Sequence, residues 1–170
     1  LMSELNLGQI RGLTVNNNVV TVPSGHTLYA PGHVVQAVTS TYSTETAISS
    51  GSWTPVNLSA TITPKFATSK ILVMVSSVMQ IDSSGQVGLF TVFRGSVSSG
   101  TNIGNGNWGL SQTYDGTGSN IRMPLNVSVL DSPNTTSATT YTCAAWRQAG
   151  ILYVHTGNVL ASITLLEIAA

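Results

Sequence analysis

The sequence predicts an all-β protein, a jelly-roll-like antiparallel β-sandwich with a short N-terminal β-stem. Three observations predict this class. Val, Ile and Leu alternate with Ser, Thr and Asn in short runs, the runs end at Gly and Pro, and helical spacing of apolar residues is nearly absent. The length of 170 residues suits one domain with a sizeable core, and 42% hydrophobic residues exclude a disordered chain.

The first segment, residues 1–32, is the predicted stem. Its apolar residues recur at short intervals and are interrupted by Gly8, Gly12 and the turn Pro23-Ser24-Gly25. Such short extended pieces cannot bury themselves, so they need neighbouring chains or a globular domain to cover them. The turn Pro31-Gly32 marks the boundary, and residues 33–170 form the predicted β-sandwich head domain.

The first half of the head contains four predicted strand regions. They are Val34 to Tyr42, a pair of short extended pieces within Trp53 to Thr63, the long apolar run Lys70 to Ile81, and Leu89 to Arg94. The run from Lys70 to Ile81 is apolar on both faces, because Ile71 and Val73 alternate with Leu72 and Met74. We therefore expect both faces of this strand to be covered.

A segment rich in Gly, Ser and Asn, residues 95–120, is predicted to be one long loop that carries Trp108 and Tyr114. After it, Ile121, Met123 and Leu125 begin a regular alternation that continues to Val129 and predicts a strand with one dry face. Pro124 cannot donate to a β-ladder, so this strand is expected at a sheet edge or a bulge. Thr139 to Arg147, Ile151 to His155 and Ser162 to Ile168 complete the set.

Charge is unusually scarce in this chain. Only 7% of the residues are charged, six basic and six acidic, and the net charge is +0, whereas about 25% is ordinary. Acid-base, metal and phosphate chemistry depend on such side chains, so the composition favours a structural or recognition protein over an enzyme. The basic residues are scattered, which argues against nucleic-acid binding, and no apolar run is long enough for membrane insertion.

The low charge also bears on assembly. A monomer with so few charges is poorly protected against self-association, whereas an oligomer buries part of that surface. In the last predicted strand, Ile163 and Leu165 share one face while Leu166 and Ile168 share the other, which again requires cover on both sides. We expect a homo-oligomer. The single Cys143 excludes an intrachain disulfide and is expected to pack as a small apolar side chain.

Several short motifs occur in a characteristic order. They are Val22-Pro23-Ser24-Gly25-His26, Ala30-Pro31-Gly32-His33-Val34-Val35-Gln36, Ile62-Thr63-Pro64, Ser69-Lys70-Ile71-Leu72-Val73, Leu130-Asp131-Ser132-Pro133 and Ser162-Ile163-Thr164-Leu165-Leu166-Glu167-Ile168. Over almost the whole chain this order resembles the C-terminal heads of tailed-phage fibre proteins, common in marine and cyanobacterial phages.

The resemblance implies a slender trimeric stem leading into a trimeric β-sandwich head similar to the C1q and tumour necrosis factor folds. It implies a virion location, contact with other virion structural proteins through the N-terminal segment, and a head that contacts the host surface. Trimeric sandwiches with similar ends also serve as head fibres, fibre-attachment proteins or capsid decoration, so a purely structural role is the alternative.

The candidate ligand-binding residues are Trp108, Gln112, Tyr114 and Asp115. Long loops on a rigid β-scaffold often bind ligands, and aromatic rings beside amide and carboxyl groups suit the apolar faces and hydroxyl edges of a host cell-surface glycan. The alternative interpretation is that Trp108 and Tyr114 hold the loop on the sheet or on a neighbouring subunit. Trp53 and Trp146 lie in strand-like runs and are expected in the core or an interface.

Other sites have little support in the sequence. His26, His33 and His155 could surround a trimer axis, but no His-x-His pair or neighbouring carboxylate supports a metal, so we expect ordinary turn or surface histidines and no cofactor. A triad of Ser24, His155 and Asp131 lacks a Gly-x-Ser-x-Gly elbow. Each of Asp82, Asp115 and Asp131 lies in a turn-like context, where Asp commonly bonds its own backbone. We expect no catalytic residues.

Overall fold

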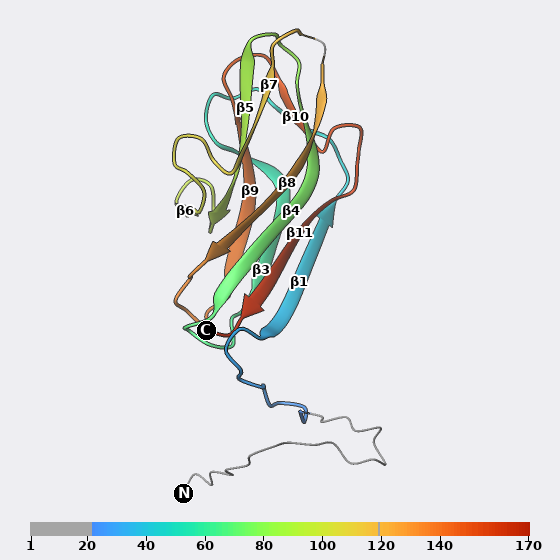
Figure 1. The fold of residues 1–170 in the computed structure, drawn as a ribbon. Helices are drawn as coiled ribbons and strands as arrows, with labels where there is room; N and C mark the ends of the chain where they lie inside the picture. Colours follow the sequence, from blue (N-terminus) through green and yellow to red (C-terminus); the bar gives the residue numbers. More distant parts are fainter. Residues whose placement is uncertain (1–21, 119) are drawn as a thin grey trace, which may run out of the picture.

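The computed structural model describes residues 22–118 and 120–170, and its described part is all-β (Figure 1). The strands are β1 (Val34–Tyr42), β2 (Thr46–Ile48), β3 (Thr54–Ile62), β4 (Lys70–Ile81), β5 (Gln86–Arg94), β6 (Thr101–Asn102), β7 (Ser111–Asp115), β8 (Arg122–Asp131), β9 (Thr139–Arg147), β10 (Leu152–Val154) and β11 (Ala161–Ile168). The described residues contain no helix long and apolar enough to cross a membrane.

Two antiparallel sheets face each other in a sandwich. Sheet A has the order β1-β11-β4-β10-β2, with β8 on the other side of β4, and sheet B has the order β3-β9-β5-β6, with β7 also on β5. Apart from the short strands, the orders are β1-β11-β4-β8 and β3-β9-β5-β7. This is the strand order of a jelly roll, in which two Greek keys are folded over each other, so the predicted fold class is confirmed.

The core lies between the two sheets and is almost entirely apolar. Every second residue of β4, from Ile71 to Ile81, points inward, and it meets the inward residues of β3, β5 and β9. The fully buried large side chains include Phe90, Leu125 and Tyr141. Cys143 is buried among them, as expected for a small apolar side chain.

Most predicted strands agree closely with the structure. Val34–Tyr42, Lys70–Ile81 and Thr139–Arg147 have the predicted bounds, and the two pieces expected between Trp53 and Thr63 form one strand, β3, whose register shifts between Pro55 and Ser59. Asn57 at this irregularity has a φ of 60°. β8 pairs only with β4 among the described strands, so Pro124 lies on an edge strand, as predicted.

Two parts of the prediction need comment. The prediction of one loop over residues 95–120 is wrong, because β6 and β7 both lie within it and pair with β5. The predicted N-terminal stem falls mostly on residues 1–21, outside the described residues. Residues 22–32 form turns without a strand, and the backbone of Gly32 and His33 is hydrogen-bonded to Ala169 at the C-terminal end.

The described start of the chain and Ala170 therefore lie at one end of the sandwich (Figure 1). Tyr29 strengthens this contact, since its hydroxyl donates to the Ala170 carbonyl oxygen at 2.8 Å and its ring packs edge-on against Phe66. The β4–β5, β7–β8 and β9–β10 connections lie at the opposite end. The head thus has an end from which the N-terminal segment leaves and a free end made of loops.

Candidate functional site

The segment between β5 and β7 runs along the edge of β5 in sheet B. Ile103 N–H donates to Val92 O at 3.0 Å, and Leu110 N–H donates to Phe90 O at 2.7 Å. The side chains of Ile103 and Leu110 pack against the core cluster. Gly109 has a φ of 68°, and a Cβ at this position would lie only 2.4 Å from Phe90 O. The segment is therefore attached to the edge of β5 by backbone hydrogen bonds and by apolar contacts with the core.

A tight turn within this segment presents Trp108. Asn105 and Gly109 exchange backbone hydrogen bonds, and Asn105 Oδ1 accepts the N–H groups of Asn107 and Trp108 at 2.9 and 3.1 Å. Asn favours such turns because its side chain replaces a backbone acceptor. With its backbone held in this way, the Trp108 side chain remains 60% exposed.

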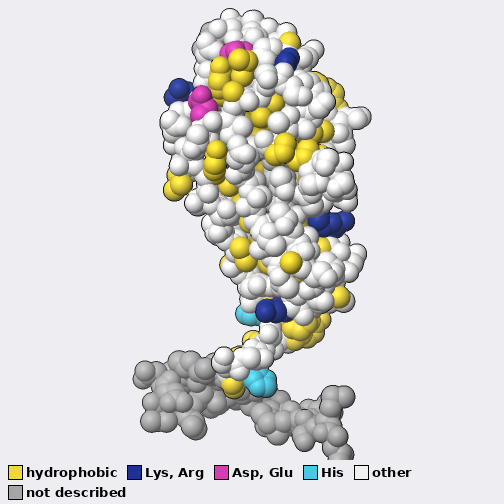
Figure 2. All heavy atoms as spheres, turned by 180° about the vertical axis from the view of Figure 1, so that it is seen from behind, with side chains coloured by type: hydrophobic (Ala, Val, Ile, Leu, Met, Phe, Trp, Pro, Cys, Tyr) yellow, Lys and Arg dark blue, Asp and Glu magenta, His cyan; other side chains and the backbone are white. Residues whose placement is uncertain are grey.

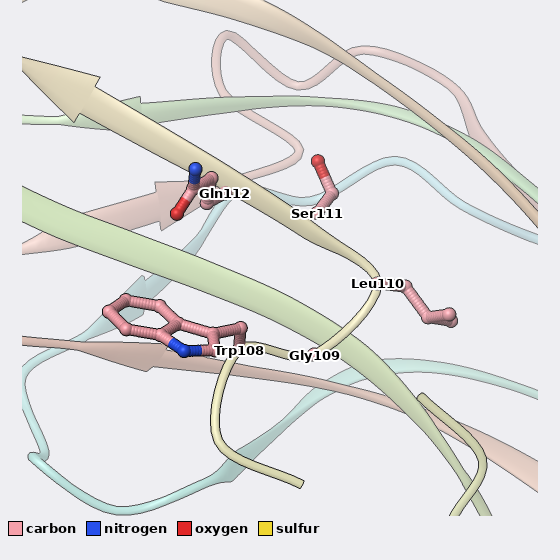
Figure 3. A pocket seen from close by; sticks show the side chains of 5 residues that line it. All are labelled: Trp108, Gly109, Leu110, Ser111 and Gln112. Carbon is pink, nitrogen blue, oxygen red and sulfur yellow. The ribbon is translucent and has the colours of Figure 1, made fainter. Parts of the chain in front are cut away.

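Trp108 lines a hollow of about 460 Å³ together with Gly109, Leu110, Ser111 and Gln112. Figure 3 shows the indole ring and the Gln112 amide on the same side of the segment, whereas Leu110 points away from them. Gln112 lies on β7, where alternate residues face outward, so Tyr114 belongs to the same face and is 59% exposed. Three of the four predicted ligand-binding residues thus share the outer face of sheet B.

Asp115 has a different position from these three. It is 1% exposed, and its carboxylate accepts the backbone N–H groups of Thr117, Gly118 and Asn120 at 2.8 to 3.0 Å. This carboxylate orders the β7–β8 turn, as Asp side chains do in Asx turns. Asp115 therefore supports the scaffold and is left out of the candidate site.

Trp53 and Trp146 lie on the outer side of sheet B, where both are half-buried. Trp53 packs edge-on against Phe93 with ring centroids 6.3 Å apart, and Trp146 Nε1–H donates to Gly51 O at 2.6 Å. Figure 2 shows the molecule from behind, where hydrophobic atoms form separate groups on a surface with few charges. A ligand that contacts such a surface meets mainly aromatic ring faces, amide groups and hydroxyl groups.

The histidines are not brought together. His26 and His33 are exposed in the segment before β1. His155 begins the turn after β10, as expected for a turn histidine, but its side chain is fully buried and does not lie on the surface. Among the described residues, no group of three or more His, Cys, Asp and Glu side chains could hold a metal ion.

His155 connects the two sheets. Its Nε2 lies 2.9 Å from Val56 O, so Nε2 carries the proton and donates, and Nδ1 accepts from the Ser77 hydroxyl at 2.8 Å. Burial lowers the pKa of His155, while the hydrogen bond to Val56 opposes this shift. Ser77 and His155 have the spacing of a nucleophile and a base, but both are buried and a substrate has no access to them.

A second polar contact between the sheets involves Arg94, Asp131 and Tyr141, and the sequence offered no local pattern for it. Arg94 Nη1 donates to both carboxylate oxygens of Asp131 at 2.9 and 3.0 Å, and the buried Tyr141 hydroxyl donates to Asp131 at 2.7 Å. Burial and the neighbouring carboxylate raise the pKa of Tyr141. This network joins the edge strand β8 to sheet B.

The fold and the surface define an all-β jelly-roll protein with exposed aromatic and amide groups on a nearly uncharged sheet face. No protein-family model matches the chain, and no curated protein matches it. The chain is similar to solved structures of infectious bursal disease virus. They are those of the Gt strain (17% identity, TM-score 0.44), the Gx strain (12%, 0.42) and the VP2 subviral particle (13%, 0.45). Each match covers 89% of this chain and 42% of the viral chain, so this protein spans less than half the length of those chains.

Proposed function

We propose that this chain is the head of a virion fibre protein, a homotrimer that binds a glycan on the host surface without catalysis. The observation that carries the proposal is the exposed Trp108 ring beside Gln112, with Tyr114 exposed on the same face of β7 as Gln112. An indole offers a flat apolar face to the C–H groups of a sugar ring, and the amide and phenol provide donors and acceptors for its hydroxyl groups.

The rigidity of this surface supports a binding role. The backbone around Trp108 is held by the Asn105 turn and by hydrogen bonds to β5, and Gln112 and Tyr114 belong to β7. Binding therefore requires little additional ordering of the protein, which lowers its entropic cost. The described segment before β1 leaves from the opposite end to the free loops, so we assign contact with other virion proteins to the N-terminal segment.

Replacing Trp108 with Ala is expected to reduce glycan binding at least tenfold and to leave the melting temperature unchanged, because most of this side chain is exposed. Binding is measured on an array of bacterial surface polysaccharides and confirmed by titration with the polysaccharide that gives a signal. Leu160→Ala is the matched control, since Leu160 is an exposed apolar residue outside the site. Equal binding by Trp108→Ala and the control would assign the head a structural role, as in capsid decoration or fibre attachment.

The homotrimer is supported by the outer face of sheet A. Its outward residues lie in cross-strand rows over β1, β11, β4 and β8. One row is Ala37, Leu166, Leu72 and Leu130, the next is Thr39, Thr164, Met74 and Ser128, and a third is Thr41, Ser162, Ser76 and Asn126. We call these three rows the uncharged surface. Lys70 and Arg122 lie at the two ends of the same face, outside the rows.

The uncharged surface has a composition suited to a subunit interface, because its rows carry no charged side chain. Four strands about 4.8 Å apart and five residues at about 3.3 Å each give a face of about 19 by 17 Å. The flat area of this face is smaller than the roughly 800 Å² that each partner buries in a stable complex, so we expect the surrounding residues to contribute as well. A hollow of about 420 Å³ beside Met74, Ser76 and Ser128 lies on this face and can receive side chains of a neighbouring copy.

Leu130→Asp is expected to dissociate the trimer, because it places a charge on the uncharged surface without removing a core side chain. Leu130 is 51% exposed on the edge strand β8, so the protomer itself remains folded. Light scattering of the unchanged protein should give three times the 17.7 kDa protomer mass, and the variant should give one protomer. Leu160→Asp, at a residue 72% exposed, should remain trimeric. A monomeric unchanged protein, or a trimeric Leu130→Asp variant, would contradict this assignment.

A further inference from the structure

A further surface hollow lies at the end of the sandwich opposite Ala170, and neither the sequence nor the Trp108 site accounts for it. Its volume is about 350 Å³, and its polar lining comes from segments far apart in the chain. The lining includes Glu45, Gln80, Asp82, Asn120, Arg122 and Tyr153. We call it the polar hollow.

Hydrogen bonds to the backbone hold both carboxylates in place. Glu45 Oε2 accepts the Gly157 N–H at 2.9 Å, and Asp82 Oδ1 accepts the Ile151 N–H at 2.7 Å and the Ser83 hydroxyl at 2.9 Å. The second oxygen of each carboxylate receives no hydrogen bond from the described residues. Each carboxylate therefore keeps one oriented acceptor for a ligand.

The donors of the polar hollow are arranged in a similar way. Arg122 Nε donates to Gln80 Oε1 at 3.2 Å, which orients the guanidinium beside Gly157. Its two terminal nitrogens, the Tyr153 hydroxyl and the Asn120 amide nitrogen donate to no acceptor within the described residues. Fixed acceptors and fixed donors thus lie around one hollow, together with the ring of Tyr153.

This combination matches a polyhydroxylated ligand. Each sugar hydroxyl both donates and accepts, so it needs carboxylate or carbonyl oxygens together with N–H or O–H groups. Two carboxylates against one guanidinium leave the polar hollow with one excess negative charge, which disfavours acidic sugars. We propose that the polar hollow binds a pyranose residue that carries no acidic group. This inference rests on the proposed glycan-binding function and adds a second subsite with its own selectivity.

The position of the polar hollow is compatible with the trimer. Gln80 pairs with Arg122 on one side and with Tyr153 on the other, beyond the rows of the uncharged surface. The polar hollow therefore lies at the rim of the proposed subunit contact, at the end where the loops are free.

The test is an NMR titration of the ¹⁵N-labelled protein with methyl glucoside, methyl galactoside and methyl glucosaminide, with methyl galacturonide as the acidic probe. We expect the neutral or amino glycosides to shift the amide signals of Gln80, Asn120 and Tyr153, and the galacturonide to bind at least fivefold more weakly. Tyr153→Phe combined with Arg122→Gln should weaken binding about tenfold. Glu45→Gln removes one negative charge, so it should reduce the difference in binding affinity between the neutral glycosides and the galacturonide.

Lys65→Gln serves as the control, because it removes an exposed charge at the other end of the molecule. Trp108→Ala should leave the shifts at the polar hollow unchanged, so failure of the Trp108 site and failure of this inference give different results. The inference is overturned if none of the non-acidic glycosides shifts these signals, or if the galacturonide binds as tightly as the neutral probes.

Discussion

Replacing Glu167 with Ala is expected to destabilise the head by about 3 kcal/mol or more, because three partly buried donors lose their charged acceptor at once. Glu167 lies on β11 and is fully buried. Its carboxylate accepts the Gln36 side-chain amide at 2.6 Å and the backbone N–H groups of Lys65 and Phe66 at 2.8 and 3.2 Å. It therefore joins β1 to the connection between β3 and β4.

The pKa of Glu167 agrees with this role. Burial alone would raise the pKa, but the hydrogen bonds from Gln36 and from the backbone of Lys65 and Phe66 outweigh burial and lower it. The charged carboxylate is thus the form that the folded protein stabilises.

Urea unfolding at one fixed protein concentration measures the effect, since the stability of an oligomer depends on concentration. Glu167→Gln is the informative control. It keeps an oxygen that can accept the two backbone N–H groups but loses the charge and the acceptor for the Gln36 amide, so we expect about 1.5 kcal/mol. If Glu167→Ala is no less stable than Glu167→Gln, the loss of the backbone acceptor is not what destabilises the protein.

Acid is expected to destabilise the head well above the pH at which carboxyl groups usually titrate, because of His155. In the folded protein His155 is neutral, donates to Val56 O and accepts from Ser77, and burial lowers its pKa below 6.5. The unfolded chain takes up a proton near pH 6.5, while the folded chain does not. The contribution of His155 to the free energy of unfolding is therefore complete above pH 6.5. It is lost as the pH falls, by at most about 1.4 kcal/mol per pH unit.

The pH dependence has a second phase. Because folding lowers the pKa of Glu167, the contribution of this residue to the free energy of unfolding is complete above pH 4.5, the ordinary pKa of Glu, and is lost as the pH falls below that value. Free energies of unfolding measured from pH 8 to pH 4 should therefore be constant at first, decline from about pH 6.5 as His155 titrates in the unfolded chain, and receive a further decline from Glu167 below about pH 4.5.

His155→Asn separates the two phases. His155 has a φ of 59°, which Asn tolerates better than most side chains, so this variant keeps the local backbone while removing the imidazole. We expect a less stable protein whose free energy of unfolding no longer changes between pH 6.5 and pH 5. If the free energy of unfolding of the variant still declines between pH 6.5 and pH 5 as it does in the unchanged protein, His155 is not the source of this pH dependence.

Local patterns were sufficient for most of the scaffold. The strands Val34–Tyr42 and Lys70–Ile81 were predicted with their observed bounds, because each is rich in residues with high β-propensity and lies close to turn residues such as Gly32 and Ser69. Pro124 placed its strand at an edge for a chemical reason that does not depend on context, the missing N–H group. β7 was missed, because its short polar sequence, Ser111–Asp115, carries no apolar alternation and becomes a strand only by pairing with β5.

The candidate sites also divide into residues that the local sequence suggests and residues that only the fold brings together. Trp108, Gln112 and Tyr114 are close in the sequence, so one segment was enough to suggest them. The polar hollow joins Glu45, Gln80, Arg122 and Tyr153 from four separate segments, and no spacing in the sequence indicates that they meet. The sequence offered two interpretations of Asp115, a ligand-binding carboxylate and a turn residue that bonds its own backbone, and only the structure shows that its carboxylate accepts three backbone N–H groups.

By itself the sequence determined the fold class, the main strands, the scarcity of charge and the apolar character of both faces of β4 and β11. These follow from alternation, turn residues and composition, which act over a few residues. Only the tertiary structure decided which polar groups are buried and satisfied, such as His155 and Glu167, and which converge on the surface, such as Arg122 and Tyr153. The reason is physical: the strand order of the jelly roll pairs residues far apart in the chain, and burial and hydrogen bonding depend on those pairings.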